Sequence, residues 1–202
     1  MSKLIIITGV SGTGKTTLAK MLNKKLEGST LLSYDEFIEK IYDMIGFKNK
    51  EQKKNLSALN IKIYKKLIEE CMKRKDEIII LEKPFKTEWR DFLGHLTKKY
   101  GYQPYTINIF SKDFQTIWNR LLKREISKED RHPAHYLDSY YFDKRNEYTP
   151  FFEYEYDTLK EEYDNLISNS INLGCIININ DIENLDIDKL IKKLLSNNKK
   201  VI

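Results

Sequence analysis

The segment Gly9-Val10-Ser11-Gly12-Thr13-Gly14-Lys15-Thr16 fits the pattern G-x-x-x-x-G-K-[ST] near the start of the 202-residue chain. An apolar run at residues 4–7 precedes it and predicts a buried parallel strand, and a helical pattern follows it at residues 17–26. Glycines allow the backbone to curl so that successive N–H groups face one anion, and the helix start adds the positive end of its dipole. The sequence therefore predicts a phosphate-binding loop between a strand and a helix.

The residues of this loop have distinct expected roles in binding a magnesium-bound nucleotide. Lys15 would reach the β- and γ-phosphates, and the Thr16 hydroxyl would be a ligand of Mg²⁺. Backbone N–H groups of the loop would face the remaining phosphate oxygens. The expected nucleotide-binding residues of this segment are Gly9, Ser11, Gly12, Thr13, Gly14, Lys15, Thr16 and Thr17.

The composition is that of one globular domain spanning residues 1–202, because 41% of the residues are hydrophobic and 32% are charged. No apolar run reaches the roughly 18 residues of a membrane span, and the first residues lack the anatomy of a signal peptide. Cys71 and Cys175 are expected to be reduced structural thiols, which favours a cytoplasmic location. The net charge of +5 favours anionic ligands, although the lysines are scattered along the chain.

Apolar runs and helical patterns alternate along the chain and predict an α/β fold with a five-stranded, mainly parallel sheet. A polar loop is expected at residues 48–55, and an inserted segment of lid and added helices at about residues 127–170. The expected strands are 4–8, 30–33, 77–81, 105–110 and 174–179, and the expected helices are 15–26, 36–45, 57–73, 89–100, 113–126 and 186–195.

Charged residues follow two of the predicted strands, and the carboxyl ends of parallel strands line a ligand crevice. Asp35 could deprotonate an attacking hydroxyl as a general base, or it could cap the helix expected to start at residue 36. Glu82 is expected to face Mg²⁺ or its waters. Lys83 could hold a substrate phosphate or extend into solvent. These residues are therefore the candidates for the metal and substrate sites.

Arginine is scarce in this chain, and four of its six copies fall between positions 120 and 145. Arg120 and Arg124 are four residues apart on one predicted helix face, and Arg131 follows in a loop. A guanidinium binds phosphate bidentately where an ammonium cannot, so these arginines could stabilise charge on a transferred phosphoryl group. One of them could instead lie on adenine. The structural alternative is surface ion pairing with Glu125, Glu129 and Asp130.

Histidines and aromatic residues mark the inserted segment. His132, His135 and Asp138 match no standard zinc spacing, so a role in ordering a lid is favoured over a metal site, and His95 is expected to be structural. The aromatic residues between positions 140 and 163 could form a stacking platform for a ligand. The favoured interpretation is that they bury the inserted helices against the domain.

The chain resembles the P-loop kinases of the nucleoside-monophosphate-kinase type, through the loop at residues 9–16, the strand-end Asp35 and Glu82, and the arginine-rich segment after the fourth strand. It is most similar to predicted small kinases related to zeta toxins, chloramphenicol phosphotransferase and the kinase half of bacteriophage polynucleotide kinase. Leu81-Glu82-Lys83-Pro84-Phe85 and Arg131-His132-Pro133-Ala134-His135 carry this similarity. The resemblance covers about residues 1–138 and 171–197.

The resemblance implies a three-layer P-loop NTPase fold with an arginine lid and an aromatic-rich helical insert. It also implies ATP and Mg²⁺ as cofactors, Asp35 as the acceptor-activating base, and Lys15 as a phosphate-binding residue. Arg124 and Arg131 would be the lid arginines, and Arg120 would meet the adenine. The expected activity is transfer of the γ-phosphate of ATP to a hydroxyl group of a small molecule.

Two other functions fit the same residues. One is a polynucleotide 5′-hydroxyl kinase, which needs a basic channel leading to Asp35. The other is a nucleotide-dependent switch that uses residues 140–170 as a partner surface. Family members differ widely in acceptor, so the fold does not select the substrate, although a small molecule is favoured over nucleic acid.

Overall fold

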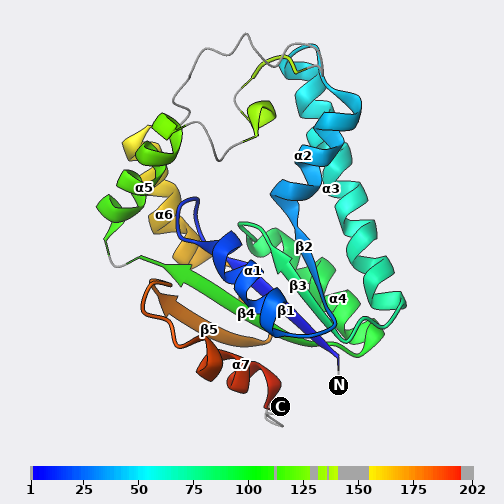
Figure 1. Ribbon diagram of the computed structural model, residues 1–202. Coiled ribbons are helices and arrows are strands. Elements are labelled where there is room, and N and C mark those ends of the chain that lie inside the picture. The colour runs from blue at the N-terminus through cyan, green and yellow to red at the C-terminus, as the bar shows by residue number, and fades with distance from the viewer. Residues whose placement is uncertain (1, 112, 128–131, 136, 141–154, 197–202) are drawn as a thin grey trace.

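The computed structural model describes residues 2–111, 113–127, 132–135, 137–140 and 155–196. Five strands form one sheet in the order β2-β3-β1-β4-β5, and every pair of neighbours is parallel (Figure 1). The strands are β1 (Lys3–Thr8), β2 (Ser29–Ser33), β3 (Ile78–Glu82), β4 (Gln103–Phe110) and β5 (Cys175–Asn180). The predicted α/β class and five-stranded sheet are confirmed, and the described sheet is parallel throughout.

Helices connect the strands and cover both faces of the sheet (Figure 1). The helices are α1 (Lys15–Lys25), α2 (Tyr34–Ile45), α3 (Lys50–Lys73), α4 (Arg90–Tyr100), α5 (Phe114–Ser127), α6 (Tyr156–Asn169) and α7 (Ile187–Leu195), with short 3₁₀ turns η1 (Thr87–Trp89) and η2 (Pro133–His135). This alternation of strands and helices places the carboxyl ends of the strands at one edge of the sheet.

The side chains of β1 alternate between two apolar layers, as the strand period requires. Leu4 and Ile6 pack in one layer with α3 and α4, and Ile5 and Ile7 pack in the other with α1 and α7. All four side chains are fully buried. This explains why the strand before the phosphate loop reads as a continuous apolar run.

Two helix pairs lie on opposite sides of the strand ends: an α2–α3 arm and an α5–α6 arm (Figure 1). α3 begins at Lys50, so the predicted loop at residues 48–55 is wrong over most of its length. The side chain of Asn49 accepts a hydrogen bond from the Gln52 amide, which satisfies a free donor of the first turn and lets the helix start early. Polar composition alone therefore concealed the first turn of a capped helix.

The described aromatic residues of the inserted segment pack against the two helical arms. Tyr140 is 3% exposed and lies with Tyr42 and Phe47 in a small cluster on the α2–α3 arm. Tyr156 and Tyr163 contact Phe114 on the other arm. These three residues follow the interpretation that the aromatics bury the insert, and the other predicted aromatic positions, 141–154, lie outside the described residues.

Candidate functional site

The segment 9–16 forms a tight loop between β1 and α1, and its glycines adopt conformations that other residues rarely adopt. Gly9, Gly12 and Gly14 have φ angles of 156°, 82° and 91°. A Cβ atom on Gly9 would lie 2.6 Å from the carbonyl oxygen of Ile109, and one on Gly14 would collide with the side chain of Ile182. Glycine is therefore favoured at position 9 by the close backbone of Ile109 and at position 14 by the left-handed φ angle.

Lys15 is the most enclosed cation of the loop. Its side chain is 8% exposed, and its Nζ donates a hydrogen bond to the Val10 carbonyl oxygen at 3.0 Å. Burial lowers the pKa of Lys15, and the nearby carboxylates Glu82 and Asp35 oppose this shift. An ammonium held in this way lies inside the loop and can transfer its hydrogen bond from a carbonyl to a phosphate oxygen.

Glu82 is the buried carboxylate at the end of β3, with 1% of its surface exposed. Its Oε1 accepts from the Thr16 hydroxyl at 3.3 Å, and its Oε2 accepts from the Ser33 hydroxyl at 2.7 Å. Burial raises the pKa of Glu82, although the Lys15 ammonium and these hydroxyl donors hold it down. A carboxylate and a hydroxyl this close form an oxygen donor set that fits Mg²⁺.

A cavity of about 370 Å³ opens beside the loop, and we call it the nucleotide cavity. It brings together residues from distant parts of the chain, because α2 contributes Asp35 and α5 contributes Arg120 and Arg124. Arg124 lies near enough to Lys15 to lower the pKa of that lysine. Other lining residues are Ser11, Gly12, Gly14, Lys15, Thr16 and Thr17. Of the predicted set, Arg131 lies outside the described residues.

Asp35 is in the first turn of α2, which begins at Tyr34, and the residue that caps the helix is Ser33. The alternative that Asp35 is the cap is therefore wrong. A carboxylate in the first turn is still stabilised by the helix dipole. Its side chain lines the nucleotide cavity together with Lys15 and Arg124. Its role as a base stays a prediction.

Arg120 is engaged in ion pairs across the mouth of the nucleotide cavity. Its Nη2 lies 2.6 Å from Glu183 and 3.4 Å from Asp181, both in the loop after β5. The sequence-based alternative named Glu125, Glu129 and Asp130 as partners, and those side chains lie outside the described part of the chain. No local pattern indicated Glu183, because the pairing depends on the position of β5 next to β4.

Lys83 lies over the aromatic ring of Tyr34, with its Nζ 3.9 Å from the ring centre. Burial lowers the pKa of Lys83, and the charges of Asp35 and Glu88 oppose this shift. The alternative of a freely solvated Lys83 is therefore wrong. Lys83 also lines a second cavity of about 550 Å³, which shares Ser11 with the nucleotide cavity.

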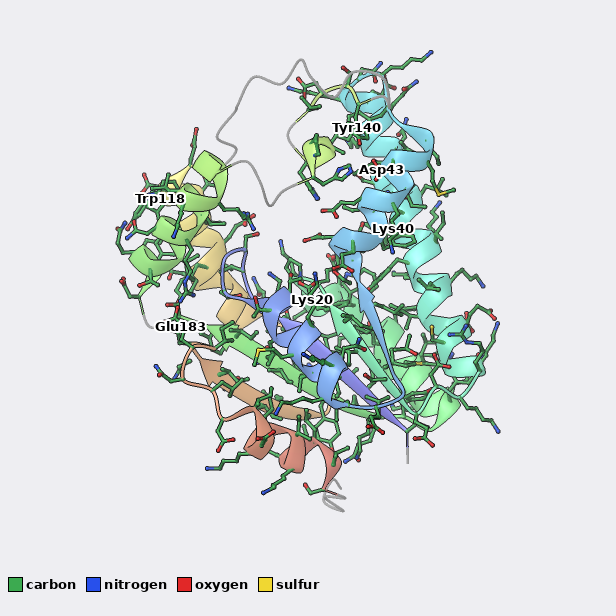
Figure 2. All side chains as sticks on the ribbon, viewed as in Figure 1. Lys20, Lys40, Asp43, Trp118, Tyr140 and Glu183 are labelled. Carbon is green, nitrogen blue, oxygen red and sulfur yellow. The ribbon has the colours of Figure 1, made fainter. Side chains whose placement is uncertain are left out.

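Residues 132–135 and 137–140 contact the α2–α3 arm. His132 Nε2 lies 3.1 Å from Asp43, and His135 Nε2 lies 2.9 Å from Glu39. The Tyr140 hydroxyl donates to Asp43 at 2.6 Å, and Figure 2 shows these two side chains side by side. Within the described residues no group of three or more metal-binding side chains is present. The role of these histidines in ordering a lid stays a prediction.

Sequence reasoning missed Ser33 and Tyr34 as residues of the site. Ser33 holds one oxygen of Glu82, and Tyr34 supports the Lys83 ammonium. Ser33 ends β2 and Tyr34 begins α2, directly before Asp35, so their position at the strand end is the signal that could have found them.

The parallel sheet, the glycine loop and the buried lysine and glutamate define a phosphate-loop protein of the kinase-like class. A match to residues 4–140 then identifies the particular family: the chain belongs to the AAA_33 family, described as an AAA domain. A protein of Archaeoglobus fulgidus that is described as a probable adenylyl-sulfate kinase is 48% identical to this chain over 56 residues. That match covers 26% of this chain and 36% of the relative, so the chain spans about a third of that protein's length.

Solved structures share the fold at low sequence identity. A candidate kinase from Chloroflexus aurantiacus has a TM-score of 0.68 at 22% identity, covering 96% of this chain and 99% of that one. The tunicamycin resistance protein of Deinococcus radiodurans has a TM-score of 0.55 at 16% identity, with 96% and 94% covered. A chain of the Pnkp1/Rnl/Hen1 RNA repair complex has a TM-score of 0.55 at 14% identity, with 83% and 44% covered.

Among the described residues, no helix combines the length and the apolar character needed to cross a bilayer.

Proposed function

We propose that this protein is an ATP-dependent phosphotransferase that moves the γ-phosphate of ATP to a hydroxyl group of a small molecule. The observation that carries the proposal is the nucleotide cavity, where Lys15, Asp35 and Arg124 meet beside the Glu82–Thr16 pair. A loop that only binds nucleotide does not require a carboxylate at this place, whereas transfer to a hydroxyl does.

In the proposed reaction the acceptor hydroxyl gives its proton to the Asp35 carboxylate. The acceptor oxygen forms a bond to the γ-phosphorus as the bond to the β-phosphate oxygen breaks, and ADP leaves. Lys15, Arg124 and Arg131 stabilise the charge on the phosphoryl oxygens. Arg120 and Thr17, which also line the nucleotide cavity, would contact the adenosine part of ATP.

Thr16 and Glu82 would hold Mg²⁺, which supplies charge neutralisation at the phosphates when it is bound. The two residues suit this role because a buried carboxylate with a hydroxyl at 3.3 Å offers hard oxygen ligands. Lys83, supported by Tyr34, would contact the acceptor.

Replacement of the base tests the proposal directly. In Asp35→Asn, transfer of labelled phosphate to a broad panel of hydroxyl acceptors should fall by about 10² to 10⁴-fold. Calorimetric affinity for ATP–Mg²⁺ should change by less than about threefold, because the amide keeps the shape of the side chain. Glu36→Gln is the matched control, since Glu36 is the next residue of α2 and pairs with Lys20. Unchanged turnover in Asp35→Asn would remove Asp35 from its role.

A polynucleotide 5′-kinase is the second candidate, supported by the net charge of +5 and by the fold shared with a chain of an RNA repair complex. A 5′-hydroxyl oligonucleotide tested across a salt series separates the two activities. Affinity for a nucleic acid should fall steeply as salt rises, whereas affinity for an uncharged small acceptor should change little.

A further inference from the structure

The second cavity, of about 550 Å³, lies next to the nucleotide cavity and shares Ser11 with it. Val10 and Ser11 of the phosphate loop contribute to its lining, and one wall is the segment that follows β3, with Lys83 and Lys86. A molecule in this cavity would therefore meet the phosphate loop at the same residue as a bound nucleotide. Asp35 lines the nucleotide cavity and lies close enough to Lys83 of the second cavity for its charge to act on the pKa of that lysine. A molecule that extends from the second cavity past Lys83 could therefore present a hydroxyl to the proposed base.

The opposite wall is one face of α6. Thr158, Glu161, Glu162, Asn165 and Asn169 all line the cavity, and their spacing of three, four or seven residues places them on the same side of the helix. Leu159 and Tyr163 lie on another side and pack with Val10 and α5. The apolar side thus fixes the helix to the α5–α6 arm and turns a continuous polar face toward the cavity.

The end of this wall is held by a buried hydrogen-bond network. The Ser170 hydroxyl, directly after α6, donates to Asn108 Oδ1 at 2.6 Å, and the amide of Asn108 donates to Asn172 and Asn178. The Ile171 amide donates to the Phe85 carbonyl oxygen, which ties α6 to the segment after β3. The two walls are therefore linked through the residues that follow α6, which fixes the end of this helix relative to the segment after β3.

We propose that this cavity binds the phosphate acceptor, and that the acceptor is a polyhydroxylated small molecule, neutral or cationic, that carries no phosphate group. The inference rests on the proposed phosphotransferase function and adds the location and chemical class of its acceptor. The argument for the class is the mixture of side chains on the walls.

Carboxylates and carboxamides are the groups that pair with hydroxyls. Glu161 and Glu162 accept hydrogen bonds, and Asn165 and Asn169 both donate and accept, which matches a molecule with several neighbouring hydroxyl groups. The described lining has three carboxylates, with Glu88, against two lysines, so an anionic acceptor is disfavoured. Arginine, which binds phosphate best, is absent from the described lining residues.

Three matched probes test this class: glucosamine, glucose and glucose 6-phosphate, which differ mainly in charge. Each is titrated into wild-type protein saturated with ADP and Mg²⁺, and binding is followed by ligand-observed NMR over the millimolar range. Glucosamine should bind about threefold more tightly than glucose, and glucose more tightly than glucose 6-phosphate by about the same factor at low salt. Tightest binding of glucose 6-phosphate, or saturable binding of none of the three, would overturn the proposal.

Variants of α6 locate the binding site. Asn165→Trp should abolish probe binding by filling the cavity, and E161Q/E162Q should remove the preference for glucosamine over glucose. Asp157→Asn is the control. Asp157 is also on α6, but its carboxylate does not line the cavity. ADP affinity should be unchanged in all three proteins. Probe binding that survives Asn165→Trp would contradict this site.

The two proposals fail differently. If labelled ATP transfers phosphate to a panel acceptor that neither fills this cavity nor responds to these variants, the phosphotransferase function stands and the acceptor site is wrong. If the probes bind as expected but labelled phosphate is transferred to no acceptor of a broad panel, the cavity is a polyol site and the catalytic function is wrong.

Discussion

The nucleotide cavity and the second cavity share Ser11, yet they differ in the burial of the residues that form them. The first is formed around the closely packed backbone of the phosphate loop, with the buried Lys15 in its wall and the buried Glu82 paired to Thr16 beside it. The second is lined largely by exposed side chains of α6 and of the segment after β3. A change in the first disturbs packing as well as binding, whereas a change in the second alters chemistry at little structural cost. The difference suggests that this fold can keep one donor and exchange its acceptor.

The largest effect is expected for Gly9→Ala. The new Cβ would meet the Ile109 carbonyl oxygen at 2.6 Å, so the phosphate loop must shift, and ATP–Mg²⁺ affinity should fall by about 100-fold. Calorimetry measures the affinity, and circular dichroism verifies the fold. Gly28→Ala is the control: it shares a positive φ but meets nothing within 4 Å, so it should cost about 1 kcal/mol of stability and leave nucleotide binding intact. Equal nucleotide affinity in both variants would contradict the packed-loop account.

Replacing each of the two arginines of α5 in turn should affect different kinetic constants. Arg124→Ala should lower kcat by about 10² to 10³-fold, because a group beside the phosphoryl site is lost. Arg120→Ala should raise the KM for ATP by about threefold with little change in kcat, because Arg120 is the residue proposed to contact the adenine. Steady-state kinetics with ATP as the varied substrate distinguishes the two, and the reverse pattern would exchange their roles.

Glu82 should make nucleotide binding depend on pH. Burial raises the pKa of this carboxyl, so it takes up a proton at a higher pH than an ordinary glutamate. A protonated carboxyl is a poor metal ligand, and Mg²⁺-dependent ATP affinity should therefore fall as the pH is lowered from about 8 towards about 5. In Glu82→Gln the affinity should be about tenfold weaker and nearly independent of pH over that range. A pH dependence that persists in Glu82→Gln would assign the titration to another group.

The smallest effect is expected on the α6 wall. Asn165→Ala should raise the KM for the acceptor by about fivefold, because one hydrogen-bonding side chain is lost. The free energy of unfolding, measured by thermal denaturation, should change by less than about 0.5 kcal/mol, since Asn165 is exposed. A large loss of stability would show that the two cavities are not built as differently as their burial indicates.

Much of the fold followed from local pattern. The strand before the phosphate loop, the loop itself and the alternation of strands and helices could be predicted because apolar periodicity and glycine chemistry act over a few residues. The helix of residues 50–73 was predicted too short, because Asn49 acts as a cap only when the chain turns there. Element boundaries thus depended on single hydrogen bonds that composition does not reveal.

The site was predictable in part. Lys15, Asp35 and Arg124 were named from motif and strand-end position, and the structure places them around one cavity. Their catalytic roles remain predictions. The pairing of Arg120 with Glu183 and the stacking of Lys83 on Tyr34 join residues far apart in the chain, and no spacing rule indicates such contacts.

By itself the sequence determined that this protein has a phosphate-binding loop on a parallel sheet, because a glycine-rich turn between an apolar strand and a helix has few other uses. Only the tertiary structure decided that α6 turns its polar face toward Ser11 and creates the second cavity. A helix has polar and apolar sides in any sequence, but the neighbour against which each side lies is fixed by packing between distant segments, and here the contact of Leu159 with α5 makes that choice.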